Sequence, residues 1–176
     1  MTSDSTDLAA LVRAIPDFPE PGILFRDITP LLANPAAFAH ALDRLAEYAI
    51  SRSPAAIVGI ESRGFLFGTP LAARLNLPFV PIRKPGKLPA ARMSVEYSLE
   101  YGSGQLDIHS DALAPGQSAL IVDDLLATGG TAAGATKLVE LLQAKVAGLA
   151  FLIELEALKG RQRLESYDVF SVIQYD

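Results

Sequence analysis

Short, largely apolar segments alternate with stretches of helical spacing along most of this sequence. The candidate strands are residues 55–60 (AAIVGI), 78–82, 119–123 (ALIVD), 149–155 and 169–173. Helices are predicted from Asn34-Pro35 through about residue 50, within 64–75 with a start that Pro70 delays, and over about 131–145. Strands that are apolar on both sides and are joined by helices form a parallel sheet covered on both faces. The sequence therefore predicts an α/β fold that binds ligands at the carboxyl ends of its strands.

Residues 85–104 depart from this pattern, because they show little apolar periodicity and contain several turn formers. A segment of that length without a face for the core is usually functional. We therefore expect a flexible loop at about residues 84–104.

The composition is that of a soluble globular protein, with 176 residues, 50% of them hydrophobic and 20% charged. This length predicts a single domain over residues 1–176. The absence of cysteine excludes disulfides, thiolate metal sites and cysteine nucleophiles. No apolar run approaches the roughly 18 residues of a membrane span, and the polar, acidic start is unlike a signal peptide. We expect a cytoplasmic protein without a membrane partner.

The distribution of charge indicates a small anionic ligand. The formal net charge is −5, which argues against binding to nucleic acid. Residues 62–95 nevertheless contain no carboxylate. The cations of this window are Arg63, Arg74, Arg83, Lys84, Lys87 and Arg92.

The strongest local signal is residues 119–131 (ALIVDDLLATGGT), an apolar strand with two carboxylates and a small-residue turn that opens a helix. Glycines let consecutive N–H groups point into one concavity, and the helix N-terminus adds free N–H groups and partial positive charge. Ala127, Thr128, Gly129, Gly130 and Thr131 are therefore expected to hold a phosphate. Asp123 and Asp124 can accept hydrogen bonds from sugar hydroxyls, so the segment predicts a site for a 5-phosphorylated ribose.

Two other phosphate motifs do not fit. Gly129 and Gly134 have the glycine spacing of a P-loop, but Ala135 stands where its lysine would be. Gly102 and Gly104 begin a dinucleotide fingerprint, but Asp107 replaces its last glycine.

The segment resembles the signature of the type I phosphoribosyltransferases, and four further segments narrow the resemblance to the adenine-specific members. They are residues 18–30 (FPEPGILFRDITP), 59–65 (GIESRGF), 83–89 (RKPGKLP) and 97–102 (YSLEYG). Residues 158–161 (LKGR) also match. The resemblance covers about residues 15–175. It implies the type I phosphoribosyltransferase fold, with a small N-terminal hood at about residues 1–34 and a flexible catalytic loop.

The resemblance implies that adenine and 5-phosphoribosyl-1-pyrophosphate react to AMP and pyrophosphate with Mg²⁺, which is bound mainly through the substrate. Asp123 and Asp124 would then serve the ribose or its metal. A non-proline cis peptide is implied for the loop at residues 61–63. The implied pyrophosphate-binding residues are Glu61, Ser62, Arg63, Arg83, Lys84 and Lys87.

The remaining assignments also come from the resemblance. Leu24, Phe25, Arg26 and Leu158 are implied to bind adenine, and a homodimer is implied. Glu100 matches a loop glutamate proposed for proton transfer. Outside this set, Glu154 is given no catalytic part, and Arg161 is expected to be a surface or interface charge.

Two alternatives remain open. A regulatory module of the same fold could sense the ribose ligand without catalysis, although this chain shows no added nucleic-acid-binding surface. A transferase for another base, such as hypoxanthine or orotate, is disfavoured by residues 18–30. The strictness of the base specificity does not follow from the sequence.

Overall fold

The computed structural model describes residues 7–98 and 103–176. The chain divides into two compact units, Met1–Arg44 and Leu45–Asp176. The first unit is larger than the expected hood at residues 1–34. Helix α2 (Pro35–Arg52) begins in the first unit and ends in the second.

The first unit contains a short 3₁₀ turn, η1 (Ala9–Leu11), a two-stranded antiparallel sheet and helix α1 (Thr29–Leu32). The sheet pairs β1 (Arg13–Pro16) with β2 (Leu24–Asp27). The predicted start of α2 is confirmed. The Asn34 side chain accepts hydrogen bonds from the N–H groups of Ala36 and Ala37, both at 3.1 Å.

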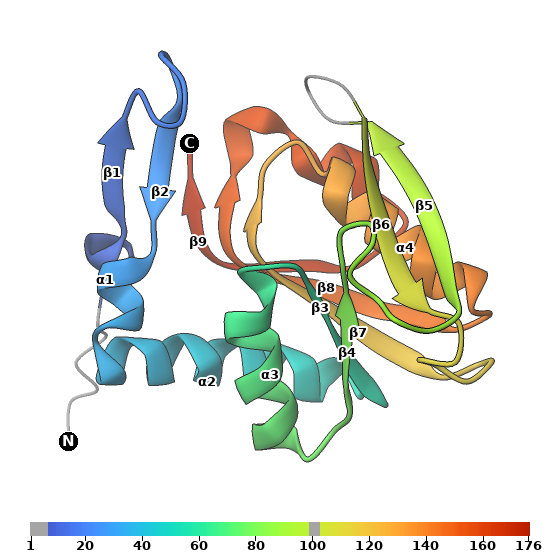
Figure 1. Ribbon diagram of the computed structural model, residues 1–176. Helices are drawn as coiled ribbons and strands as arrows, with labels where there is room; N and C mark the ends of the chain where they lie inside the picture. The colour runs from blue at the N-terminus through green and yellow to red at the C-terminus, as the bar shows by residue number, and fades with distance from the viewer. Residues whose placement is uncertain (1–6, 99–102) are drawn as a thin grey trace. The chain divides into compact units, whose positions relative to one another are not determined.

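The second unit is built on a parallel sheet of order β4-β3-β7-β8-β9 (Figure 1). Its strands are β3 (Ala56–Ile60), β4 (Phe79–Ile82), β7 (Ser118–Leu126), β8 (Lys145–Leu155) and β9 (Val169–Tyr175). Each lies where an apolar segment predicted it, so the α/β prediction is confirmed. Strand β7 continues through the aspartates to Leu126, three residues beyond its predicted end.

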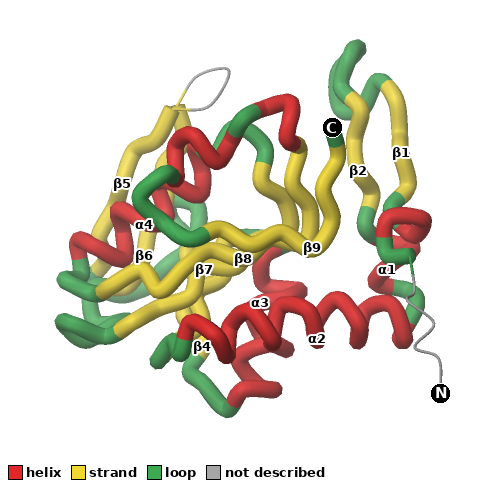
Figure 2. The backbone as a smooth tube through the Cα atoms, turned by 180° about the vertical axis from the view of Figure 1, so that it is seen from behind, coloured by secondary structure: helices red, strands yellow, loops and turns green. Residues whose placement is uncertain are grey.

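Helices α3 (Gly64–Leu75) and α4 (Gly130–Leu141) lie on opposite sides of this sheet (Figures 1 and 2). Alternate strand residues such as Val58, Ile121 and Phe151 pack with α4 in one buried cluster. Gly64 lets the start of α3 approach β7, because a Cβ there would lie 2.8 Å from the carbonyl oxygen of Val122. The start of α3 is thereby fixed beside the aspartates.

Two predicted helix boundaries are wrong. Helix α3 begins at Gly64 despite Pro70, which it contains, so proline did not delay its start. Helix α4 ends at Leu141, not near residue 145, because Gln143 adopts a left-handed φ of 59° and Lys145 already begins β8.

The expected loop at residues 84–104 contains a strand. Strand β5 (Arg92–Ser98) pairs antiparallel with β6 (Ser103–His109) and packs against α4. Among the described side chains of β5, Val95 and Tyr97 pack against the core. After β8 the chain forms two 3₁₀ turns, η2 (Glu156–Leu158) and η3 (Gly160–Leu164). Over residues 7–98 and 103–176, no helix has the length and apolarity that a membrane span needs.

Candidate active site at the carboxyl edge of the sheet

A cavity of about 570 Å³ lies at the carboxyl ends of β3 and β7. It brings together the predicted pyrophosphate, ribose and phosphate segments. Its lining includes Glu61, Ser62, Arg63, Lys84, Asp123, Asp124, Ala127 and Thr131. The peptide bond between Glu61 and Ser62 is cis, which confirms the feature implied for this loop.

The loop at residues 127–131 connects β7 to α4. Gly129 caps the helix in a left-handed conformation with φ 80°, which favours glycine. A Cβ at this position would also collide with the carbonyl oxygen of Gly160, at the start of η3. Helix α4 begins at Gly130, so its first N–H groups lack intrahelical partners. The loop therefore has the donors that a phosphate requires.

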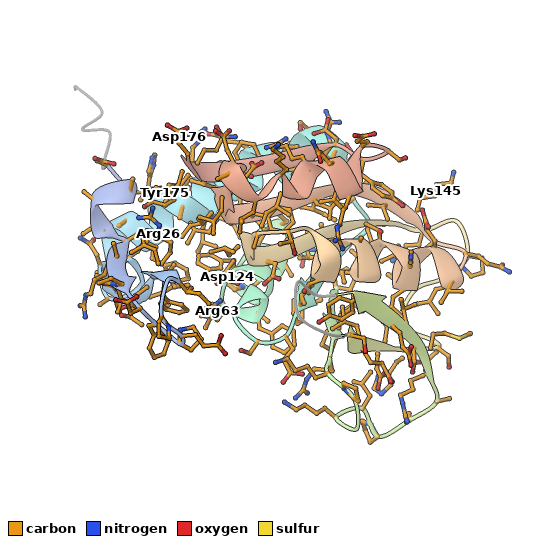
Figure 3. The ribbon with its side chains drawn as sticks, turned by 90° about the horizontal axis from the view of Figure 1, so that it is seen from above. Arg26, Arg63, Asp124, Lys145, Tyr175 and Asp176 are labelled. Carbon is orange, nitrogen blue, oxygen red and sulfur yellow. The ribbon has the colours of Figure 1, made fainter. Side chains whose placement is uncertain are left out.

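The aspartates at the end of β7 have different partners. Asp124 is 6% exposed and forms an ion pair with Arg63, whose Nε lies 2.7 Å from a carboxylate oxygen of Asp124. The two side chains lie side by side in Figure 3. Asp123 accepts the N–H of Asp124 at 2.9 Å. Both aspartates line the cavity and can accept hydrogen bonds from ligand hydroxyls.

The aspartate pair has raised pKa values. Burial and the adjacent charge of Asp124 raise the pKa of Asp123 well above its ordinary value. Burial also raises the pKa of Asp124, and the Arg63 guanidinium offsets part of that rise. The pair therefore takes up a proton more readily than two exposed aspartates would.

Glu61 is clamped by the cations at the end of β4. Its side chain is 8% exposed and accepts hydrogen bonds from Arg83 Nε and the Lys84 N–H, both at 2.9 Å. The ammonium group of Lys87 donates to the other carboxylate oxygen. Burial raises the pKa of Glu61, but the hydrogen bond from Lys87 and those of its other donors outweigh this effect and lower it to about 2.

The carboxylate-free window in the sequence is therefore not free of carboxylates in space. Glu61 precedes the window and pairs with Arg83 and Lys87. Asp107 follows the window and lies 3.2 Å from Nε of Arg92. The absence of carboxylates from the window therefore does not leave an uncompensated positive field, because carboxylates from outside it pair with Arg63, Arg83, Lys87 and Arg92.

The donor set fits a divalent ion held mainly by a ligand. In the described residues, no cluster of three or more histidine, cysteine or acidic side chains could hold a metal. Asp123 and Asp124 supply carboxylates beside open cavity space. Mg²⁺ is commonly bound by one or two carboxylates together with substrate phosphates.

As formed by the described residues, the lining does not include the residues predicted to contact adenine or to transfer a proton. Leu24, Phe25 and Arg26 belong to β2 of the first unit. Leu158 ends η2 in the second unit and is 41% exposed. Glu100 lies outside the described residues.

Sequence reasoning missed several residues at or near the cavity. Tyr97, Leu106 and Leu125 line it. Arg161 was expected to be a surface or interface charge, and its side chain is 44% exposed, but its two-pronged ion pair with the buried Glu154 was not predicted. The alternation of apolar residues in 93–97 could have revealed β5, whereas no local pattern marks the Arg161 pair.

Comparison with known proteins identifies the family. Residues 27–176 match the family model described as the phosphoribosyl transferase domain. The adenine phosphoribosyltransferase of Roseiflexus sp. strain RS-1 is 58% identical over 171 residues, covering 97% of this chain and 99% of the relative.

Solved structures agree in fold. The adenine phosphoribosyltransferase of Thermoanaerobacter pseudethanolicus matches with a TM-score of 0.93 and 51% identity over 96% of this chain and 98% of its own. The enzyme of Saccharomyces cerevisiae, complexed with an imino-altritol bisphosphate and adenine, matches with a TM-score of 0.88 and 43% identity. That match covers 94% of this chain and 96% of the yeast chain.

The Glu61 clamp predicts a pH-dependent contribution to stability. Because the folded pKa of about 2 lies below the ordinary 4.5, the ionised carboxylate stabilises the fold above pH 4.5, and this contribution is lost as the pH falls toward 2. We expect Glu61→Gln to lower the free energy of unfolding at pH 7 by about 1–3 kcal/mol. The difference from wild type should shrink across that acid window in urea titrations. Glu165→Gln, which changes an exposed carboxylate, is the control. A difference between wild type and Glu61→Gln that stayed constant with pH would contradict the assignment.

Proposed function

This chain belongs to the phosphoribosyltransferase family, and we propose that it is an adenine phosphoribosyltransferase. It would transfer the 5-phosphoribosyl group of 5-phosphoribosyl-1-pyrophosphate to N9 of adenine, giving AMP and pyrophosphate in purine salvage. The observation that carries this proposal is the cavity that joins a phosphate loop, an aspartate pair and a cation cluster. The near full-length identity to adenine phosphoribosyltransferases supports adenine as the base.

The substrate 5-phosphoribosyl-1-pyrophosphate carries a phosphate at one end and a pyrophosphate at the other, and one orientation matches these two ends to the two sides of the cavity. Its 5-phosphate would accept hydrogen bonds from the N–H groups and hydroxyls of residues 127–131, and its ribose hydroxyls would donate to Asp123 and Asp124. The pyrophosphate would then point toward Arg63 and Lys84, which line the same cavity. Ser62 would add a hydroxyl donor. Arg83 and Lys87, which both donate to Glu61, would add positive charge near the pyrophosphate.

In the reaction, the bond between C1 of the ribose and the pyrophosphate oxygen breaks, and a bond from N9 of adenine to C1 forms. Positive charge grows on the sugar while negative charge collects on the leaving group. Cations fixed at the leaving group stabilise this separation of charge, since they need no reorganisation during the step. The purine must also lose a proton, and Glu100 would accept it.

Mg²⁺, when bound to the pyrophosphate of the donor, supplies further neutralisation of the leaving group. Asp123 and Asp124 are the residues that would hold it. Their raised pKa values mean that a bound cation would favour release of protons from the pair.

The adenine contacts and the assembly rest on the family resemblance. Backbone groups at Leu24 and Arg26 would recognise the exocyclic amine, while Phe25 and Leu158 would supply apolar contacts. A cytoplasmic homodimer stays a prediction on the same basis.

One assay separates the proposal from its alternatives. The protein is incubated with 5-phosphoribosyl-1-pyrophosphate and Mg²⁺ together with adenine, hypoxanthine or orotate, and nucleotide formation is followed. We expect AMP with adenine and little product with the other bases. Binding of the donor without any nucleotide product would favour a regulatory module, and preferential formation of another nucleotide would reassign the base.

Lys87→Ala should weaken binding of 5-phosphoribosyl-1-pyrophosphate far more than binding of AMP, which lacks the pyrophosphate. One charge-assisted contact contributes about 1.5–3 kcal/mol, so the loss for the donor should be about tenfold or more. Arg63→Ala is expected to act in the same direction. Paired calorimetric titrations measure both ligands. Lys145→Ala is the matched control, since Lys145 begins β8 and lies away from Arg63 and Asp124 (Figure 3). Equal losses for donor and AMP would remove these cations from the pyrophosphate site.

Glu100→Gln should lower kcat by about tenfold or more with little change in AMP affinity, because glutamine keeps the size of the side chain but cannot exchange a proton. Single-turnover kinetics measure the chemical step directly. If that step is unchanged, the assignment is wrong, and Glu96, an exposed residue of β5, is the next candidate.

A further inference from the structure

The ion pair between Glu154 and Arg161 joins the sheet to the segment that follows it. Glu154 lies on β8, and Arg161 lies on η3. Arg161 donates from Nε to one carboxylate oxygen at 2.6 Å and from Nη2 to the other at 2.7 Å. Its remaining Nη1 donates to the carbonyl oxygen of Val169 at 2.8 Å. The guanidinium therefore holds η3 to two adjacent strands.

Glu154 is a buried carboxylate whose partners fix it in place for Arg161. It is 3% exposed, and its carboxylate also accepts a 2.7 Å hydrogen bond from the hydroxyl of Ser171 on β9. Burial raises the pKa of Glu154, but the hydrogen bonds from Arg161 and Ser171 outweigh this and hold it below its ordinary value. A buried carboxylate with these partners fixes the orientation of the guanidinium, because a change of geometry would leave charge unpaired.

The residue before Arg161 touches the phosphate loop. A Cβ on Gly160 would collide with the carbonyl oxygen of Ala127, and a Cβ on Gly129 would collide with the carbonyl oxygen of Gly160. The backbones of η3 and of residues 127–131 are therefore in direct contact. Lys159, just before Gly160, has a left-handed φ of 53°, so the segment turns sharply at the contact.

We propose that Arg161 is a positioning residue for the phosphate loop: paired with Glu154, it holds Gly160 against Ala127 and Gly129 and so sets the loop for the 5-phosphate. Arg161 acts through the backbone of Gly160 and does not touch the ligand. The inference rests on the proposed function, which assigns the 5-phosphate to residues 127–131.

A neighbouring arginine provides a matched control. Arg52 on α2 forms a 2.8 Å ion pair with Asp168, the residue before β9. Like Arg161, it therefore joins a helical segment to the start of β9. Asp168 lies outside η3, so this pair supports the sheet without holding Gly160 against the loop.

The test compares Arg161→Lys with Arg52→Lys. Lysine keeps the charge but cannot make the two-pronged contact. Calorimetry measures the affinity for two ligands. AMP carries the 5-phosphate, whereas pyrophosphate with Mg²⁺ does not. We expect Arg161→Lys to weaken the binding of AMP by about tenfold and to leave the affinity for pyrophosphate within about twofold of wild type. Arg52→Lys should change the affinity for neither ligand appreciably.

Three results would overturn the proposal: unchanged AMP affinity in Arg161→Lys, equal losses for AMP and pyrophosphate, or the same AMP loss in Arg52→Lys. Glu154→Gln gives a second route if Arg161→Lys folds poorly, and it should produce the same selective loss. The double substitution Arg161→Lys with Glu154→Gln should lose little more AMP affinity than either single substitution, because each breaks the same ion pair. Failure of the wild-type protein to bind or form AMP would instead count against the proposed function.

Discussion

Adjacent parallel pairing of β3 and β7 brings charged residues from two distant segments to one edge of the cavity. The two strands run in register from Ala56 opposite Ala119 to Gly59 opposite Val122. The residues that follow, Glu61 to Arg63 on one strand and Asp123 with Asp124 on the other, therefore emerge at one edge although about 60 positions separate them. The Arg63–Asp124 ion pair closes this edge at 2.7 Å.

Internal pairing decides how an anionic ligand can bind here. Arg63, Arg83 and Lys87, which are expected to meet pyrophosphate, already pair with carboxylates, and both Glu61 and Asp124 are almost fully buried. A guanidinium carries five N–H donors and a lysine ammonium carries three, so a cation that contacts a carboxylate can also donate to a ligand. The carboxylates thus hold the cations in fixed positions and lower their net field. Cations held in fixed positions reduce the entropy lost on binding. A lower net positive field favours ligands with several negative charges over those with one.

The sequence predicted the parts of this protein whose information is local. The 119–131 segment carries its strand, turn and helix start in one stretch, so the turn between β7 and α4 could be predicted from the sequence. Strand β5 was missed although apolar residues alternate in 93–97, because few of its described side chains are buried. The partners of the cations were also missed. Glu61 stands immediately before the carboxylate-free window, and only the fold reveals that its side chain turns back onto Lys87. Likewise, nothing near Arg161 in the sequence shows that Glu154 is buried.

The supports of the two halves of the cavity are separate. On the cation side, Glu61 joins the ends of β3 and β4, whereas the loop at residues 127–131 contacts η3, which is paired to β8. A donor with phosphate at one end and pyrophosphate at the other would bridge both halves, so its C1 would be fixed only when both ends are held. A ligand held at one end keeps rotational freedom about the reacting carbon, and lost orientation of this kind is costly in rate. Under the proposed function, the sheet between the two supports would set the distance over which 5-phosphoribosyl-1-pyrophosphate is aligned, so the spacing of β3, β7 and β8 would itself be a part of the catalytic geometry.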